Sequence, residues 1–237
     1  MRSNTNKEIA TKLKKPEIVI PSKSDSYQMH PKNKLNQDKY QITAWVYDIL
    51  DYPWELKYKK WRPSLVGDLR GEVLEAGVGT GHNLKHYHND VNLTALDFSK
   101  AMLRRSMKRA RNARCRVTFV REDACSMESI ADDRFDWVVA LFLCCVIPAE
   151  LQHKVIGQIA RVLKPGGRFR FLEMIYSKTP ALKKRQDFFA PFVEKVYGAR
   201  FDRKTLDHVK EAENLKITST RFLLHDTYLL IEGTRDD

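Results

Sequence analysis

A short apolar segment that runs into an acid and a cluster of glycines constrains the fold of this chain more than any other feature. Residues 73–76 are Val-Leu-Glu-Ala, and residues 77–81 are Gly-Val-Gly-Thr-Gly. The pattern predicts a buried strand and then a turn that opens a helix. Glycine lacks a Cβ and tolerates positive φ, so this turn lets the backbone approach a ligand closely. Glu75 stands just before the turn, where it would meet a positively charged or hydroxyl-rich ligand.

Strands and helices are predicted to alternate from this point onward. The expected strands are 72–75, 93–96, 117–120, 137–143, 168–173, 216–223 and 227–233. Helices are expected from about residue 82 and over 99–113, 149–163, 180–197 and 203–212, with a Lys-Pro-Gly-Gly turn at 164–167. Strands separated by helices imply right-handed crossovers and a parallel sheet. The sequence therefore predicts a doubly wound α/β fold with a mostly parallel seven-stranded sheet and a terminal antiparallel hairpin.

Charge and composition narrow the possible partners. The chain has 42 Lys and Arg against 30 Asp and Glu, which indicates an anionic partner or surface. Residues 100–121 hold nine of these cations and no acid, which fits either an anionic partner or an ordinary solvated helix face. Residues 1–38 are expected to form a flexible basic tail, and residues 39–237 a single domain. No run of 18 apolar residues and no secretory signal is present, so a cytoplasmic location is expected.

Two amphipathic segments are expected to border the site. The first covers residues 40–62 and contains three of the four tryptophans beside several lysines. The second is an insertion at 180–204, where three phenylalanines, at 188, 189 and 192, lie among basic residues. Aromatic rings flanked by Lys and Arg suit the surface of an anionic membrane. Both segments could equally pack on the domain as lids, and the two readings are compatible.

Acids follow the next two strands as well. Asp97 ends the second strand, and Asp123 follows the third. In an open parallel sheet, ligands bind beyond the carboxyl ends of the strands, so the two acids and Glu75 are expected to share one site. Asp97 would accept ribose hydroxyls, and Asp123 an exocyclic amine such as that of adenine. Because the third glycine falls at 81 rather than 82, and because Glu75 would repel a pyrophosphate, S-adenosylmethionine is favoured over a nicotinamide dinucleotide.

The ordered set of motifs resembles the class I S-adenosylmethionine-dependent methyltransferases, which are Rossmann-like. The segments that carry the resemblance are 73–81, 94–99, 121–124, 135–139 and 163–169. The resemblance implies that Glu75, Gly77, Gly79 and Gly81 hold the methionine part of the cofactor. It also implies that Asp97 holds the ribose, that Phe98 packs on adenine beside Asp123, and that Ala124 and Leu141 complete the cofactor site.

The chain is most similar to the quinone C-methyltransferases and bacterial phospholipid N-methyltransferases. Tyr40 and Tyr47 lie in a Tyr/Ala/Tyr-Asp pattern like that of the helix which those enzymes lay over the cofactor. We therefore expect Tyr47 to position the acceptor and Tyr40 to lie near the methionine carboxylate. Glu173 and His225 are candidates for proton handling. Several relatives have a histidine after the acid of the fifth strand, where this chain has Met174, so that role cannot be carried over.

The expected activity is methyl transfer to the amine headgroup of a phospholipid such as phosphatidylethanolamine, on the inner face of a membrane. The alternatives are a quinone C-methyltransferase, a small-molecule thiol or amine methyltransferase, and a silent S-adenosylmethionine-binding scaffold. Nucleic acid is not an expected partner, because the segment after the fourth strand, Ala-Leu-Phe-Leu over 140–143, is too apolar to hold a flipped base. His82, His86 and His88 have no neighbouring acid or cysteine, so no metal is expected.

Overall fold

The structure is a computed structural model that describes residues 54–236. Its sheet has the strand order β3-β2-β1-β4-β5-β7-β6. The strands are β1 Gly71–Ala76, β2 Val91–Leu96, β3 Arg116–Val120, β4 Phe135–Leu141, β5 Leu163–Met174, β6 Leu215–Phe222 and β7 Tyr228–Arg235. All pairs are parallel except β5 with β7 and β7 with β6. The predicted mostly parallel, seven-stranded α/β sheet with a terminal hairpin is confirmed within the described residues.

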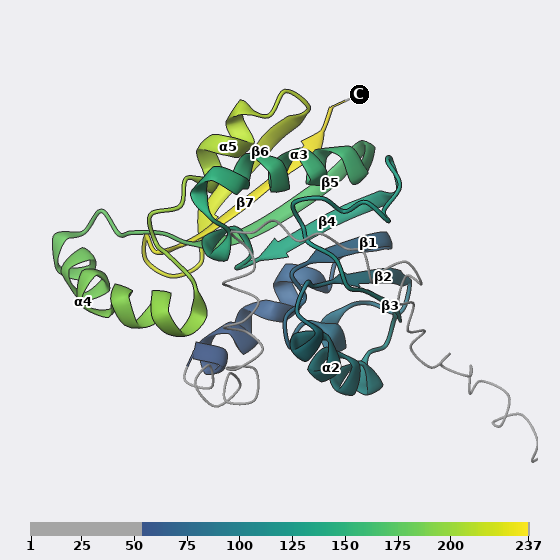
Figure 1. The fold of residues 1–237 in the computed structure, drawn as a ribbon, viewed down its shortest axis with the longest axis horizontal. Helices are drawn as coiled ribbons and strands as arrows, with labels where there is room; N and C mark the ends of the chain where they lie inside the picture. Colours follow the sequence, from purple (N-terminus) through teal and green to yellow (C-terminus); the bar gives the residue numbers. More distant parts are fainter. Residues whose placement is uncertain (1–53, 237) are drawn as a thin grey trace, which may run out of the picture.

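Helices cover both faces of this sheet (Figure 1). The α-helices are α2 Lys100–Arg109, α3 Gln152–Val162, α4 Pro180–Tyr197 and α5 Thr205–Glu211, and residues 54–66 are also helical. Alternate residues of a strand pack in two different cores. Leu74 packs in the core that includes α3 and α5, and Val73 packs in the core that includes Leu103 of α2. Successive side chains of a strand point to opposite faces, so a strand buried on both sides is apolar throughout.

Most predicted boundaries shift by a few residues, and three of the differences change the course of the chain. The helix expected from residue 82 is only a 3₁₀ turn at Leu84–His86, because Tyr87 is already extended as the chain enters β2. The fourth strand stops at Leu141 rather than 143, since Phe142 adopts a positive φ of 62°. The predicted turn at 164–167 lies inside β5, where the pairing with β4 shifts register between Phe135 and Trp137. Four residues of β5 lie there opposite one residue of β4, and Gly166 adopts a positive φ of 71°, so β5 is locally irregular at the predicted turn.

Several expectations fall on residues that the structure does not describe. The tail at 1–38, Tyr40, Tyr47 and the first part of the segment 40–62 lie outside the described residues, so their predicted roles stay predictions. The remainder of that segment belongs to the helix over 54–66. The second amphipathic segment forms α4, which stands out from the body of the molecule near the end of β4 (Figure 1). Among residues 54–236, no helix combines the length and apolarity needed to cross a bilayer.

Candidate functional site

One cavity of about 880 Å³ lies where the turns after β1, β2, β3 and β4 meet. That volume is typical of sites that hold a cofactor-sized molecule. The helix over 54–66, α4, the end of β5, residues 199–201 and residues 224–228 contribute further lining. Two halves can be distinguished by composition. We call the part lined by residues of 75–83, 96–102, 123–124 and Leu141 the cofactor half, and the part lined by Tyr58, Trp61, Phe142, α4 and 224–228 the acceptor half.

Glu75 is the acid of the cofactor half that is most strongly tied to its surroundings. Its carboxylate accepts hydrogen bonds from Asn83 Nδ2 at 2.5 Å and from the Tyr87 hydroxyl at 3.0 Å. Arg62 Nη1 in turn donates to Asn83 Oδ1 at 2.5 Å, and Arg62 also forms a two-bond ion pair with Glu55. Burial raises the pKa of Glu75 to about 7, while the bonds from Asn83 and Tyr87 oppose that rise. An ammonium group placed beside Glu75 would favour its ionised form.

The glycine turn and Asp97 are joined directly. Gly79 N donates to Asp97 Oδ2 at 2.9 Å, and Ser99 N donates to Asp97 Oδ1 at 2.8 Å. A carboxylate offers about four acceptor positions, so the two backbone bonds leave capacity for ligand hydroxyls. Burial raises the pKa of Asp97 to about 6, and the two backbone bonds oppose this. Gly79 has a φ of 55°, and a Cβ built on it would meet nothing within 4 Å, so the backbone here borders open space.

Asp123, Phe98, Ala124 and Leu141 all line the same half of the cavity, as the predicted cofactor set requires. Asp123 is buried, and its Oδ1 accepts from Cys125 N at 2.9 Å. Its neighbour Glu122 closes the following loop by accepting from Ser129 N and Ser129 Oγ, at 2.9 and 2.7 Å. The Asp123 carboxylate therefore sits at the start of a loop that is fixed by its own side chains.

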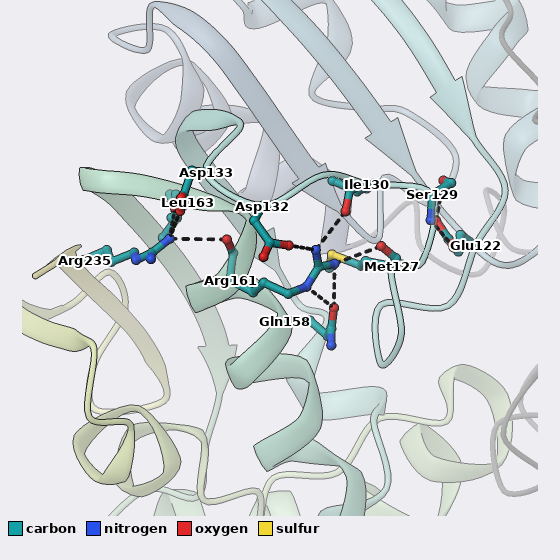
Figure 2. A network of polar contacts seen from close by, with 10 residues as sticks. All are labelled: Glu122, Met127, Ser129, Ile130, Asp132, Asp133, Gln158, Arg161, Leu163 and Arg235. Atoms are coloured by element: carbon teal, nitrogen blue, oxygen red, sulfur yellow. Dashed lines mark hydrogen bonds and ion pairs between the residues drawn. The ribbon is translucent and has the colours of Figure 1, made fainter. Parts of the chain in front are cut away.

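Arg161 of α3 holds this loop from the other side (Figure 2). Its Nη2 donates to the Met127 carbonyl at 2.9 Å, and its Nη1 to the Ile130 carbonyl at 2.8 Å and to Asp132. Met127 has a positive φ of 45°, a backbone conformation that persists only where the surroundings enforce it. Arg235 of β7 adds bonds to Asp133 and to the Leu163 carbonyl. The end of the sheet and α3 together thus fix the loop that carries Asp123.

Aromatic rings dominate the acceptor half. Tyr58 lies 5.8 Å from Trp61, 4.8 Å from Phe142 and 5.9 Å from Tyr228, measured between ring centroids. Tyr228 also contacts Trp61 at 5.2 Å and Phe142 at 6.2 Å. Among the described residues that line the cavity, the acids are Glu75, Asp97 and Asp123, so the acceptor half contributes none. Its cations, such as Lys57, Lys60 and Arg185, belong to the helix over 54–66 and to α4.

The sequence and the fold of this chain are similar to those of known methyltransferases. The model of a methyltransferase domain matches residues 73–167, which include the glycine turn and both acids after it. In a solved structure of the N-methyltransferase NodS from Bradyrhizobium japonicum, in complex with S-adenosyl-L-homocysteine, the fold matches with a TM-score of 0.56. That likeness covers 77% of this chain and 87% of NodS at 17% identity. Residues 73–167 therefore carry a methyltransferase domain of the class I, S-adenosylmethionine-dependent kind. Its cofactor is S-adenosylmethionine, and the open glycine turn with three flanking carboxylates fits that molecule.

The names of the relatives of this methyltransferase domain refer to different methyl acceptors. A phosphatidylethanolamine N-methyltransferase from Cereibacter sphaeroides is 38% identical over 98 residues, 41% of this chain and 47% of the relative. Human thiol S-methyltransferase TMT1A is 32% identical over 107 residues, 44% and 42% of the two chains. A demethylmenaquinone methyltransferase from Halalkalibacterium halodurans is 33% identical over 106 residues, 45% and 42%. The chain spans less than half the length of each of these relatives.

Glu173 lies behind the methyltransferase cavity rather than among its lining residues. Its Oε1 accepts from Cys144 N at 3.0 Å, and its side chain is almost fully buried. Burial raises the pKa of Glu173 to about 8. These contacts describe a carboxyl group that supports the backbone after β4. Its predicted part in proton handling stays a prediction, whereas His225, the other candidate, does line the cavity.

Sequence reasoning missed side chains that reach the site from a distance. Tyr228 begins β7 and meets Tyr58 across 170 positions of sequence, and Arg161 meets the Asp123 loop across about 30. Asn83 and Tyr87, the partners of Glu75, were also not predicted. For these last two a signal existed, because a buried acid needs donors, and a polar and a hydroxyl side chain four residues apart follow the glycine turn. For Tyr228 and Arg161 no local pattern gives such a signal.

Proposed function

We propose that the protein is a peripheral membrane enzyme that transfers a methyl group from S-adenosylmethionine to the amine headgroup of a phospholipid. One observation carries the proposal: the acceptor half of the cavity is aromatic, lacks a carboxylate among the described residues, and borders basic side chains and an exposed row of phenylalanines. Apolar walls suit a lipid chain, and the nearby cations suit a lipid phosphate.

The row of phenylalanines belongs to α4. Phe188, Phe189 and Phe192 are 78%, 51% and 51% exposed, and Phe189 also lines the cavity. Lys184, Arg185 and Lys195 are exposed on the same helix. An exposed apolar row beside cations is the composition of a helix that rests in the interface of an anionic bilayer. In that position the lipid headgroup would reach the cavity past Phe189 without crossing open water.

The chemical demand on the protein is mainly one of placement. The bound cofactor supplies an electrophilic methyl group on a sulfonium. The glycine turn, Glu75 and Asp97 would fix the cofactor, and the acceptor half would hold the nucleophile in line with the methyl group and away from water. Such alignment of two reactants accounts for a large part of the barrier reduction in transfers of this kind. A neutral amine needs no dedicated carboxylate base, which agrees with the composition of the acceptor half.

Two other acceptors have support among the relatives. The similarity of this chain to human thiol S-methyltransferase TMT1A supports a thiol acceptor. Its similarity to the demethylmenaquinone methyltransferase supports a quinol carbon as acceptor. A quinol would want a base near its hydroxyl, and His225 is a lining residue that could serve. We place the amine first, because the relative with the highest of the three identities acts on phosphatidylethanolamine by name and because a membrane-bordering cavity suits a lipid.

The test is to incubate the full chain with S-adenosylmethionine labelled in its methyl group and a total lipid extract. The expected result is label in phospholipid, in mono- or dimethylated ethanolamine headgroups. Label in quinone alone would overturn the amine in favour of the second acceptor, and label in a low-molecular-mass thiol supplied in parallel would favour the third. Tight binding of S-adenosyl-L-homocysteine with no transfer to any acceptor would revive the scaffold alternative.

A further inference from the structure

The acceptor half contains a continuous surface of four rings, which we call the aromatic wall: Tyr58, Trp61, Phe142 and Tyr228. They come from three separate parts of the chain, namely the helix over 54–66, the residue after β4 and the first residue of β7. Every ring contacts at least two others, with centroids 4.8 to 6.2 Å apart, and all four line the cavity. The ring planes meet at angles of 35° to 87°, so the four rings form an angular wall and not one flat face, and a ligand would contact the ring faces that border the cavity.

Two residues of the cavity lining, one of them in the wall, have a strained backbone conformation. Phe142 has a φ of 62°, which is a genuine outlier for a bulky residue. Its N–H still donates to the Leu172 carbonyl at 2.7 Å, so the backbone is held by the sheet while the ring joins the wall. His225, another lining residue, has a φ of 46°. Such conformations cost free energy and cluster at ligand sites, where the surrounding structure enforces them.

The electrostatics of the wall discriminate between the three acceptors. The face of an aromatic ring is negative, so it attracts a cation and gives no comparable benefit to an anion. When an amine attacks the methyl group, the N–C bond forms as the C–S bond breaks, and the nitrogen becomes positively charged before it releases a proton to water. A thiolate or a quinol anion loses its negative charge in the same step. Only the amine gains a cation that the wall can stabilise.

We propose that the aromatic wall is the subsite that receives the substrate nitrogen and holds the methylated ammonium group against its ring faces. The inference rests on the proposed function and names which part of the headgroup is recognised and by what force. The hydroxyls of Tyr58 and Tyr228, 3.3 Å apart, lie within the wall and offer oxygen acceptors to an N–H of an incompletely methylated headgroup. A trimethylated headgroup has no N–H left and is held by the rings alone.

A matched pair of probes tests this without a variant. Choline carries a trimethylammonium group, and 3,3-dimethylbutan-1-ol has the same shape with a neutral tert-butyl group. The dissociation constant of each is measured by calorimetry on the full chain saturated with S-adenosyl-L-homocysteine. Choline is expected to bind about tenfold more tightly, a typical cation–π preference in a partly desolvated site. Equal affinities, or tighter binding of the neutral alcohol, would overturn the proposal.

Variants locate the effect on the wall. Trp61→Leu and Phe142→Leu each remove one ring and are expected to reduce the preference for choline several-fold. Tyr228→Phe keeps the ring and should retain the preference. Phe189→Leu is the matched control, because it removes a cavity-lining ring on α4 that has no ring contact with the wall. Loss of the preference in Phe189→Leu but not in Trp61→Leu would contradict the assignment. Affinity for S-adenosyl-L-homocysteine checks that each variant is folded.

The probe experiment and the lipid-labelling experiment test separate claims, so each can fail without the other. A choline preference without label in any phospholipid would keep the wall as an ammonium subsite and remove the lipid acceptor. Label in phospholipid with equal binding of the two probes would keep the enzyme and remove the wall as its recognition element.

Discussion

The two halves of the cavity are built in opposite ways. The cofactor half comes from the ends of successive strands, holds all three lining acids of the described residues and is stiffened by hydrogen bonds such as those that Asp97 receives from Gly79 and Ser99. The acceptor half comes from segments as distant as Tyr58 and Tyr228, lacks acids among the described residues and is held by ring contacts. Sheet topology therefore determines the cofactor half, whereas tertiary packing determines the acceptor half.

This difference predicts that the halves can be damaged separately. The largest effect is expected from Asp97→Ala, which removes the predicted ribose acceptor and leaves the amides of Gly79 and Ser99 without their partner. Affinity for S-adenosyl-L-homocysteine should fall roughly hundredfold, because two charge-assisted hydrogen bonds to a ligand are lost. Calorimetry measures this, with the exposed Asp90→Ala as control. Unchanged affinity in Asp97→Ala would remove the predicted ribose role.

The next largest effect is expected from the cations of α4, which we propose to face the membrane. Replacing Lys184 and Lys195 of α4 by Gln should weaken binding to anionic vesicles about thirtyfold at low salt, from about 1 kcal/mol for each cation near the surface. Sedimentation with vesicles measures the partition. Arg104→Gln with Lys108→Gln removes the same charge from α2 and is expected to have little effect. If both pairs weaken binding equally, the protein meets the membrane through its overall charge and not through α4.

A third prediction concerns the hydrogen bonds by which Arg161 holds the loop that carries Asp123. Arg161→Met removes the donors to the Met127 and Ile130 carbonyls, so affinity for S-adenosyl-L-homocysteine should fall about tenfold as Asp123 loses its fixed position. The dissociation constant of choline should not change. Arg134→Met, in the same loop, is the control, since the Arg134 side chain stacks on Phe135. Equal affinity in Arg161→Met and wild type would show that the loop is held without it.

The smallest predicted effect concerns pH. Burial raises the pKa of Glu75 to about 7, and an ammonium group favours the ionised form, so cofactor binding should release a proton near neutral pH. Affinity for S-adenosyl-L-homocysteine should therefore fall several-fold from pH 8 to pH 6. Calorimetry in buffers of different ionisation enthalpy measures the proton release, and Glu75→Gln should reduce it to the part that Asp97, with a pKa of about 6, contributes.

The raised pKa of Glu75 also makes the stability of the ligand-free protein depend on pH. Ionised Glu75 is costly in the folded state because its carboxylate is buried; the charge of Asp97 adds to that cost, and the charge of Arg62 reduces it. The contribution of Glu75 to stability is fully present below the pKa of about 4.5 that it has when unfolded, and it is lost as pH rises through about 7. Thermal unfolding of wild type and Glu75→Gln should differ in this window. A rise in the contribution of Glu75 with pH would contradict the assignment.

The sequence predicted the residues of the cofactor half well and those of the acceptor half poorly. Glu75, Asp97 and Asp123 were found because each stands at the end of a strand whose apolar pattern is local, and parallel strands bring those ends together. Tyr228 could not be placed beside Tyr58, because their contact depends on β7 inserting between β5 and β6. The strain at Phe142 was equally hidden, since sequence pattern extends the strand to 143 and only the packed structure turns the chain at 142.

The most direct test of the account compares three defined acceptors that are presented in the same membrane. Initial rates of methyl transfer are measured with a short-chain phosphatidylethanolamine, an alkanethiol of equal length and demethylmenaquinol, all in the same anionic vesicles. The account predicts that kcat/KM is highest for the ethanolamine lipid and that Trp61→Leu lowers it while leaving the affinity for S-adenosyl-L-homocysteine unchanged. A higher kcat/KM for the thiol or the quinol, unaffected by Trp61→Leu, would contradict it.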